Sequence, residues 1–128
     1  MKCFIIDDDS TTRFLINDML SSIGGIEVIG SFESPIVALE NYLKQKPELI
    51  FLDVEMPGLT GVEFANSILP ETKIVFISSK KEYAVDAYGL NAIDYLLKPV
   101  TLPRLTQAIL KLKSTSHNNS STDEEKDH

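Results

Sequence analysis

The chain has 128 residues, 43% of them hydrophobic, which suits one globular domain with a packed core and leaves no room for a second. Its 12 basic and 19 acidic residues give a net charge of -7, so we expect this segment to bind neither nucleic acid nor anionic membranes. With one cysteine (Cys3, expected in the core), no signal-peptide pattern and no apolar run near the ~18 residues of a membrane span, the sequence predicts a cytoplasmic protein.

Five short apolar runs rich in Ile, Val and Phe predict β-strands. They cover residues 3–6, 26–29, 49–52, 74–77 and 95–97. Each run is too short for a helix, and the third and fourth are apolar at every position. This pattern is typical of parallel strands that are covered on both faces of a sheet.

A segment with helical periodicity follows each predicted strand. The first helix is expected to end at the glycines at 24–25, the second to begin at Ser34, and the third to begin with a capping box from Thr60 to Glu63. The residues expected to face the core are Phe14, Leu15, Met19, Leu20 and Ile23 in the first helix, Leu39, Tyr42 and Leu43 in the second, Phe64, Ala65, Ile68 and Leu69 in the third, Tyr83, Ala84, Ala87 and Tyr88 in the fourth, and Leu102, Leu105, Ile109 and Leu112 in the fifth.

The alternation of strands and helices predicts a three-layer, doubly wound α/β fold with one parallel sheet. Such sheets bind ligands outside the carboxyl ends of their strands. The last residues, 114–128, are polar and contain no large apolar side chain. We therefore expect the domain to cover residues 1–113, and residues 114–128 to form a disordered tail or the start of an interdomain linker.

Charged and hydroxyl side chains leave the carboxyl ends of four predicted strands. They are Asp7, Asp8 and Asp9 after the first, Asp53 after the third, Ser78 after the fourth and Lys98 after the fifth. Carboxylates that share one edge repel each other unless a cation lies among them, and Mg²⁺ prefers such oxygen ligands. The pattern predicts a Mg²⁺ site, with Mn²⁺ as a substitute, and phosphoryl transfer to Asp53 while the metal, Lys98 and Ser78 hold the transferred oxygens.

Simpler interpretations exist for the same residues. The three aspartates at 7–9 could form a solvated turn, with Asp9 or Ser10 as the N-cap of the first helix, and Ser78 and Lys98 taken singly could be ordinary surface residues. The fold alone would also suit a flavodoxin-like electron carrier or a small phosphatase. The placement at matching strand ends favours a phosphoryl-transfer site, and the first loop has no Gly-rich sequence to hold a flavin phosphate.

Together these residues resemble the receiver domain of two-component response regulators. The resemblance covers residues 1–113 and implies the flavodoxin-like (βα)5 fold, with a parallel five-stranded sheet of order 2-1-3-4-5. It rests on the acidic pair Asp7-Asp8, on Asp53 followed by Met56-Pro57 and Gly61, on Ser78, and on Lys98-Pro99.

The resemblance implies a role for each acidic residue. Asp7, Asp8 and Asp53 would bind Mg²⁺ together with the backbone carbonyl of Glu55. Asp53 would be phosphorylated by a sensor histidine kinase or a phosphotransfer protein, and the domain would catalyse this transfer and the slow hydrolysis of its own phosphoryl group. We also expect Glu55 and Lys80 to form an ion pair across the mouth of the site. These two residues flank the route of a hydrolytic water, so their pairing would slow hydrolysis of the phosphoryl group.

The resemblance also implies a switch. Tyr95 would change rotamer when the Ser78 hydroxyl moves toward the phosphoryl group held by Lys98, and the face made by the fourth helix, fifth strand and fifth helix would respond. The bond from Lys98 to Pro99 is expected to be cis. Gly61 is expected to have a structural role.

Residues 82–99, EYAVDAYGLNAIDYLLKP, look like the subgroup whose receivers precede a LytTR DNA-binding domain. The implied output is transcription, with DNA bound only through such a further domain, and homodimerisation through the fourth and fifth helices is compatible with the resemblance. The alternative is a pseudo-receiver, a protein-binding module that acts without phosphorylation.

Overall fold

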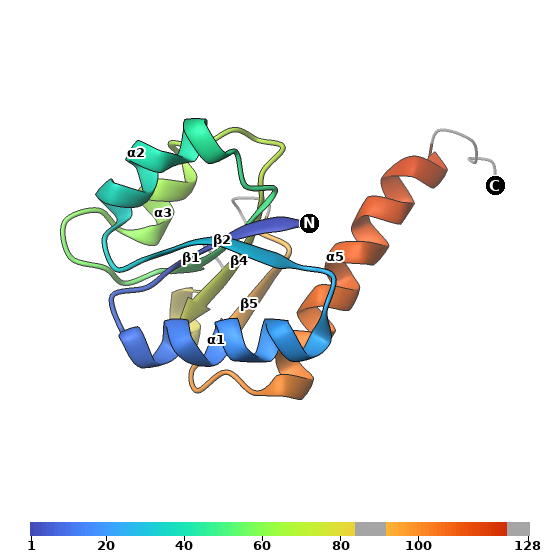
Figure 1. Cartoon of the computed structure of the whole chain (residues 1–128), viewed down its shortest axis with the longest axis horizontal. Coiled ribbons are helices and arrows are strands. Elements are labelled where there is room, and N and C mark those ends of the chain that lie inside the picture. Colours follow the sequence, from blue (N-terminus) through green and yellow to red (C-terminus); the bar gives the residue numbers. More distant parts are fainter. Residues whose placement is uncertain (84–91, 123–128) are drawn as a thin grey trace.

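The computed structural model (Figure 1) describes the backbone of residues 1–83 and 92–122 and the side chains of residues 1–82 and 92–114. Its elements are β1 (Lys2–Ile6), α1 (Ser10–Ile23), β2 (Glu27–Phe32), α2 (Pro35–Gln45), β3 (Leu49–Asp53), α3 (Gly61–Ala65), β4 (Lys73–Ser78), a 3₁₀ turn η1 (Lys81–Tyr83), β5 (Asp94–Leu97) and α5 (Leu102–Thr122). All neighbouring strands pair in parallel, in the order β2-β1-β3-β4-β5. The predicted doubly wound α/β fold and strand order are confirmed.

Helices cover both faces of the sheet (Figure 1). On one face, α1 and α5 pack against the sheet through a cluster that includes Ile16, Leu20, Leu105 and Ile109. On the other face, α2 and α3 contribute Ala38, Tyr42 and Phe64. Every residue of β3 is buried, so the middle of the sheet is covered on both sides and its carboxyl edge has a fixed shape.

Cys3 lies in the core, as predicted. It is fully buried in β1, and burial raises the pKa of its thiol to about 12. The thiol is therefore protonated at neutral pH and behaves as a small apolar side chain.

The helices begin at the residues whose side chains can cap them. Asp9, and not Ser10, caps α1 by accepting the backbone N–H of Thr11 at 3.1 Å. Ser34 caps α2, and Thr60 and Glu63 form both hydrogen bonds of the predicted capping box at α3. These local signals can be read from sequence because each needs only residues within one turn.

The buried faces predicted for the helices are partly wrong. The inward positions of α1 are Thr12, Ile16 and Leu20, whereas Phe14 is 68% exposed. The third helix ends at Ala65. The apolar residues predicted to face the core that are exposed instead are Phe14, Leu15, Leu43, Leu69 and Leu102. A helix on a sheet buries only a narrow row of residues three and four apart, so a broad apolar stripe cannot be buried completely.

Residues 114–122 belong to the segment predicted to be a disordered tail or the start of an interdomain linker, and in the structure they continue α5 to Thr122. The segment contains neither Gly nor Pro, and its Ser, Thr and Asn residues each cost only about 0.5 kcal/mol of helix stability relative to Ala. A helix anchored by Leu105 and Leu112 can therefore extend beyond its packed part. Figure 1 shows the end of α5 projecting beyond the sheet, and the domain limit at residue 113 stays a prediction.

The fourth helix, predicted around Tyr83 to Tyr88, falls mostly on residues 84–91, outside the described residues. The described part of this region forms the turn η1 (Lys81–Tyr83). Within the described parts of the chain, no helix combines the length and the apolar character that a membrane span requires.

Candidate functional site

The carboxyl ends of four strands bring the predicted site residues to one edge of the sheet. Asp7 follows β1, Asp53 ends β3, Ser78 ends β4 and Lys98 follows β5. Backbone hydrogen bonds continue past the strand ends, from Asp7 N to Phe32 O at 3.0 Å and from Lys98 N to Ser78 O at 2.8 Å. Because the sheet register extends into these loops, the site residues have little freedom to move apart.

Three carboxylates form an acidic cluster that could hold a metal ion. One oxygen from each of Asp7, Asp8 and Asp53 lies within 4.8 Å of the others. Asp7 and Asp53 are buried, whereas Asp8 is exposed to solvent. Among the described residues, Asp7 Oδ2 is a buried side-chain oxygen that accepts no hydrogen bond of good geometry, although the Lys98 ammonium lies 3.0 Å from it. A buried carboxylate oxygen beside two further carboxylates fits a hard divalent cation such as Mg²⁺.

Lys98 supplies the positive charge opposite the carboxylates. Its Nζ lies 3.0 Å from Asp7 Oδ2 and 3.7 Å from Asp53 Oδ2, and it donates a hydrogen bond to Asp7 Oδ1 at 3.3 Å. Burial alone would lower the pKa of Lys98, but the hydrogen bond and the negative charges of Asp7 and Asp53 raise it overall. The ammonium is therefore firmly charged at neutral pH. The bond from Lys98 to Pro99 is cis, as predicted.

Asp53 is held in an environment that resists its ionisation. Burial raises the pKa of Asp53 to about 7, the neighbouring Asp7 adds to the increase, and the Glu55 N–H and Lys98 oppose it. The Glu55 N–H donates to Asp53 Oδ1 at 3.1 Å and so fixes the carboxylate. A cation among the aspartates would relieve their repulsion and return Asp53 to its ionised form.

A second group of contacts connects Ser78 to Tyr95. Ser78 is buried, and its hydroxyl accepts the backbone N–H of Lys80 at 3.0 Å. The hydroxyl of Tyr95 donates to the Lys80 carbonyl, and the Lys80 ammonium lies 3.4 Å from Glu55 Oε2. The predicted pairing of Glu55 with Lys80 is confirmed. Lys80 thus contacts Ser78 through its backbone N–H, Tyr95 through its carbonyl and Glu55 through its ammonium group.

The comparisons with known proteins agree with this geometry. The family model of the response regulator receiver domain matches residues 3–110. The chain belongs to the response regulator receiver family. This receiver domain is 40% identical over 115 residues to an uncharacterized response regulatory protein of Shewanella oneidensis, in a match that covers 88% of the chain and 49% of that protein.

Two further proteins share the sequence and the fold of the receiver domain. It is 33% identical over 115 residues to the transcriptional regulatory protein BtsR of Salmonella typhi, covering 88% of the chain and 48% of BtsR. It superposes on the crystal structure of the response regulatory domain of MrkE from Klebsiella pneumoniae with a TM-score of 0.83 and 31% identity, covering 92% of this chain and 99% of that one. The chain spans about half the length of the curated relatives it matches.

Gly61 lies against the backbone of the loop that carries Asp53. A Cβ at this position would overlap the carbonyl oxygen of Asp53 and lie 2.7 Å from the Cα of Val54. Both are backbone atoms that cannot rotate away, so a side chain at position 61 would displace the loop. This close approach gives a physical reason for the structural role predicted for Gly61.

Arg13 was not recognised from the sequence as part of this edge. Its Nη1 donates to the backbone carbonyl of Asp7 at 2.7 Å, which fixes the turn bearing the acidic cluster and brings a positive charge close to it. The available signal was an arginine on the second turn of a helix that begins directly after the aspartates. The direction of its long side chain, back toward the helix start, is typical of helical residues.

An ion cluster on the receiver domain, unforeseen from the sequence, joins β5 to α5. Asp94 is fully buried, and Arg104 donates to both of its carboxylate oxygens at 2.7 Å. The Lys111 ammonium lies 3.1 Å from the same carboxylate. Burial alone would raise the pKa of Asp94, but hydrogen bonds from Arg104, the Tyr95 N–H and Lys111 lower it to about 2.

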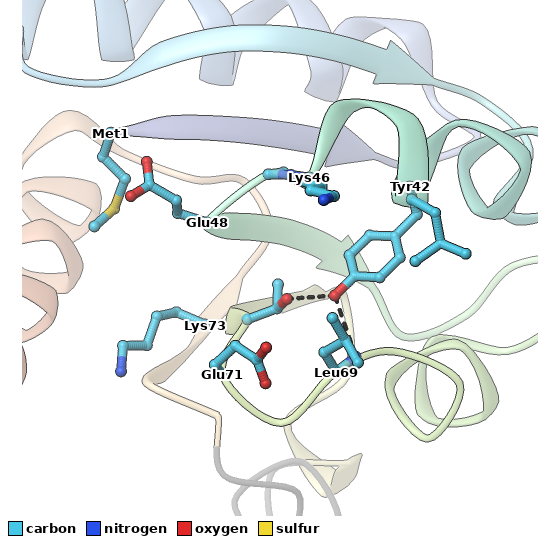
Figure 2. Close-up of a pocket in the computed structure, with 10 residues that line it drawn as sticks. Met1, Tyr42, Lys46, Glu48, Leu69, Glu71 and Lys73 are labelled. Atoms are coloured by element: carbon cyan, nitrogen blue, oxygen red, sulfur yellow. Dashed lines mark hydrogen bonds between the residues drawn. The ribbon is translucent and has the colours of Figure 1, made fainter.

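A hollow of about 360 Å³ opens near the amino ends of the strands, away from the acidic cluster (Figure 2). Tyr42 lines it, and its hydroxyl bonds to the Thr72 hydroxyl and accepts the backbone N–H of Leu69 at 3.1 Å. The rim carries charges of both signs, from Lys46, Glu48, Glu71 and Lys73. Because the aspartates and Lys98 lie at the other edge of the sheet, this hollow is separate from the candidate site.

Proposed function

We propose that this receiver domain accepts a phosphoryl group on Asp53 in a Mg²⁺-dependent reaction and that phosphorylation switches the face formed by the fourth helix, β5 and α5. The observation that carries the proposal is the acidic cluster of Asp7, Asp8 and Asp53, with Lys98 paired to two of its members. A purely structural site would gain nothing from two buried carboxylates and a third beside them at one edge of the sheet.

Asp53 is the nucleophile in this proposal. One carboxylate oxygen attacks the phosphorus of a phosphohistidine, the new P–O bond forms, the P–N bond breaks, and its electron pair stays on the imidazole. Lys98 stabilises the charge of the transferred oxygens, and the buried Ser78 hydroxyl turns from the Lys80 N–H toward them.

Asp7, Asp8 and Asp53 would hold Mg²⁺, with Mn²⁺ as a substitute and the Glu55 carbonyl as a further ligand. The bound ion would neutralise charge on Asp53 and on the phosphoryl oxygens. The raised pKa of Asp53 supports this assignment, because the carboxylate needs an additional positive charge to be fully ionised at neutral pH.

The switch is proposed to run through Ser78 and Tyr95. Lys80 joins the two, since its N–H donates to Ser78 and its carbonyl accepts the Tyr95 hydroxyl. If Ser78 turns toward a phosphoryl group, the Lys80 loop loses one of its contacts and Tyr95 can change rotamer. The altered face, which includes a predicted helix outside the described residues, would then favour a partner or a homodimer.

The phosphoryl donor is proposed to be a sensor histidine kinase or a phosphotransfer protein. Apolar side chains of α1 support such docking, since Phe14 is 68% exposed and Leu15 lines a hollow of about 330 Å³ that reaches Asp9 and Lys98. Exposed apolar groups next to a reactive site commonly mark protein interfaces.

The output is proposed to be transcription. The name of the relative BtsR, a transcriptional regulatory protein, supports this, as does the likeness of residues 82–99 to receivers that precede a LytTR DNA-binding domain. DNA would be bound through that further domain, because this segment carries a net charge of -7. The proposed location is the cytoplasm.

Acetyl phosphate tests the proposal directly. Incubation with acetyl phosphate and Mg²⁺ should add one phosphoryl group to the protein, detected by intact mass, and the addition should fail with EDTA or in Asp53→Asn. A matched variant, Asp18→Asn, removes an exposed carboxylate from α1 and should react normally. Wild type that stays unmodified with Mg²⁺, and that binds no beryllofluoride, would favour the pseudo-receiver alternative.

Lys80→Ala is expected to speed loss of the phosphoryl group. The Lys80–Glu55 pair spans the mouth of the site, and its ends are partly exposed, so its effect is mainly steric and we expect about a two- to fivefold faster dephosphorylation. The measurement is decay of the phosphorylated protein after acetyl phosphate is removed. Lys81→Ala, which removes the neighbouring lysine, serves as the control, and equal rates in wild type and Lys80→Ala would contradict the expectation.

A further inference from the structure

The ion cluster of Asp94, Arg104 and Lys111 lies across the sheet from the proposed switch residue. Successive side chains of β5 point to opposite faces. Tyr95 packs with the side chains on the α2 and α3 face, whereas the next core residue of the strand, Leu96, packs with α1 and α5. Asp94, on the same side as Leu96, is bound by two cations from α5.

The ion cluster also forms hydrogen bonds with the backbone of Tyr95. Arg104 Nη2 donates to the Tyr95 carbonyl at 3.3 Å in addition to its bond with Asp94. The Tyr95 N–H donates to Asp94 Oδ1 at 2.8 Å. Both backbone polar groups of Tyr95 are therefore tied to groups of the ion cluster, while its hydroxyl is tied to Lys80 on the other side.

These contacts form a continuous series from the acidic cluster to α5. Asp53 is bonded to the Glu55 N–H, Glu55 pairs with Lys80, and Lys80 contacts Ser78 and Tyr95. From Tyr95 the series continues through Arg104 into α5. Each link is a hydrogen bond or an ion pair between named atoms.

We propose that Asp94, Arg104 and Lys111 are positioning residues that make α5 respond to the position of Tyr95. The proposal rests on the proposed phosphorylation switch and assigns it a mechanical connection to α5. A bidentate guanidinium fork has a fixed geometry, so a displacement of the Tyr95 backbone must move Arg104 or break one of its bonds. A lysine at position 104 keeps the charge but cannot hold both carboxylate oxygens and the Tyr95 carbonyl together.

The experiment separates occupancy of the acidic cluster from the response of α5. The full chain with Mg²⁺ is compared with and without beryllofluoride, a mimic of the phosphoryl group. Bound fluoride is followed by ¹⁹F NMR, and amide hydrogen exchange is followed in peptides covering residues 102–114 and 76–83. The variants are Arg104→Lys and a double variant, Asp94→Asn with Arg104→Gln, which removes both charges. Lys113→Met, an exposed lysine of the same helix, is the control.

The proposal is tested by the ratio of amide exchange rates with and without beryllofluoride, taken for each of the two peptides. In wild type and Lys113→Met, beryllofluoride should change exchange in both peptides. In Arg104→Lys and the double variant, the change in residues 102–114 should shrink by about threefold or more, while ¹⁹F NMR and residues 76–83 respond as in wild type. A merely structural role would raise exchange in α5 equally in both states and leave the ratio unchanged.

Two results overturn the proposal, and they are distinguishable. If wild type binds beryllofluoride and either α5 does not respond or Arg104→Lys responds fully, the ion cluster does not couple α5 to Tyr95 although the proposed function stands. If wild type binds no beryllofluoride with Mg²⁺, the proposed function fails first and the coupling fails with it.

Discussion

Asp53→Asn is expected to abolish phosphorylation and, in the absence of metal, to stabilise the fold by about 2 kcal/mol near pH 8. The amide has the same shape but no charge. It therefore removes the repulsion between Asp53 and the buried Asp7, and it removes the cost of burying an ionised carboxylate. Loss of the reaction together with a gain in stability is typical of a site in which function requires like charges to be held together.

The pH dependence gives the sign of this effect. The pKa of Asp53 is raised to about 7 in the folded state from its ordinary 3.8, so the folded protein binds a proton more tightly than the unfolded chain. Stability of the metal-free wild type should fall as the pH rises through this interval and level off above it. Asp53→Asn should lack that decline.

Urea unfolding with EDTA between pH 5 and pH 8, for wild type, Asp53→Asn and the control Asp18→Asn, provides the measurement. Mg²⁺ at about a hundred times its dissociation constant should then stabilise wild type by about 2.7 kcal/mol and Asp53→Asn by much less. An Asp53→Asn variant that is no more stable than wild type at pH 8 would show that the aspartates do not repel one another.

Much of the site was predictable because its residues stand at strand ends. A parallel strand buried on both faces is visible as a short apolar run, and its carboxyl end is simply the next residue along the chain. Asp7, Asp53, Ser78 and Lys98 are all located by this argument, and their convergence follows from parallel pairing alone. Their closeness therefore required no knowledge of helix packing.

The helix faces and the ion cluster depended on information that the sequence does not display. Phe14 and Leu43 belong to apolar stripes wider than the row that a sheet can cover, so sequence alone could not decide which part is buried. The apolar run at residues 95–97 does not include Asp94, and a buried aspartate is acceptable only where partners compensate its charge. Those partners, Arg104 and Lys111, come from a helix whose register on β5 is set by packing.

Arg104→Met is expected to destabilise the protein by about 3 kcal/mol at neutral pH, because it leaves the fully buried Asp94 with only part of its compensation. The methionine fills a similar volume without charge or hydrogen-bond donors. Lys111 and the Tyr95 N–H remain near the carboxylate, so the loss should stay at the lower end of the range for broken buried ion pairs. Equilibrium urea unfolding measures the difference, and Lys113→Met, at an exposed position of the same helix, should change stability little.

Acid should remove most of this difference. The pKa of Asp94 is lowered to about 2 in the folded state from its ordinary 3.8, so the ion cluster contributes its full stability above the unfolded-state value and loses it as the pH falls toward 2. In Arg104→Met the pKa of Asp94 should rise, because its strongest donors are gone, and the stability of the variant should then approach that of wild type between pH 5 and pH 3.

A second variant, Asp94→Leu with Arg104→Met, removes both charges and should recover most of the lost stability, since a well-packed apolar pair commonly replaces a buried ion pair without cost. Two results would show that the ionised form of Asp94 in the core does not depend on Arg104. One is a constant difference in unfolding free energy between Arg104→Met and wild type across this pH interval, and the other is a double variant less stable than Arg104→Met alone.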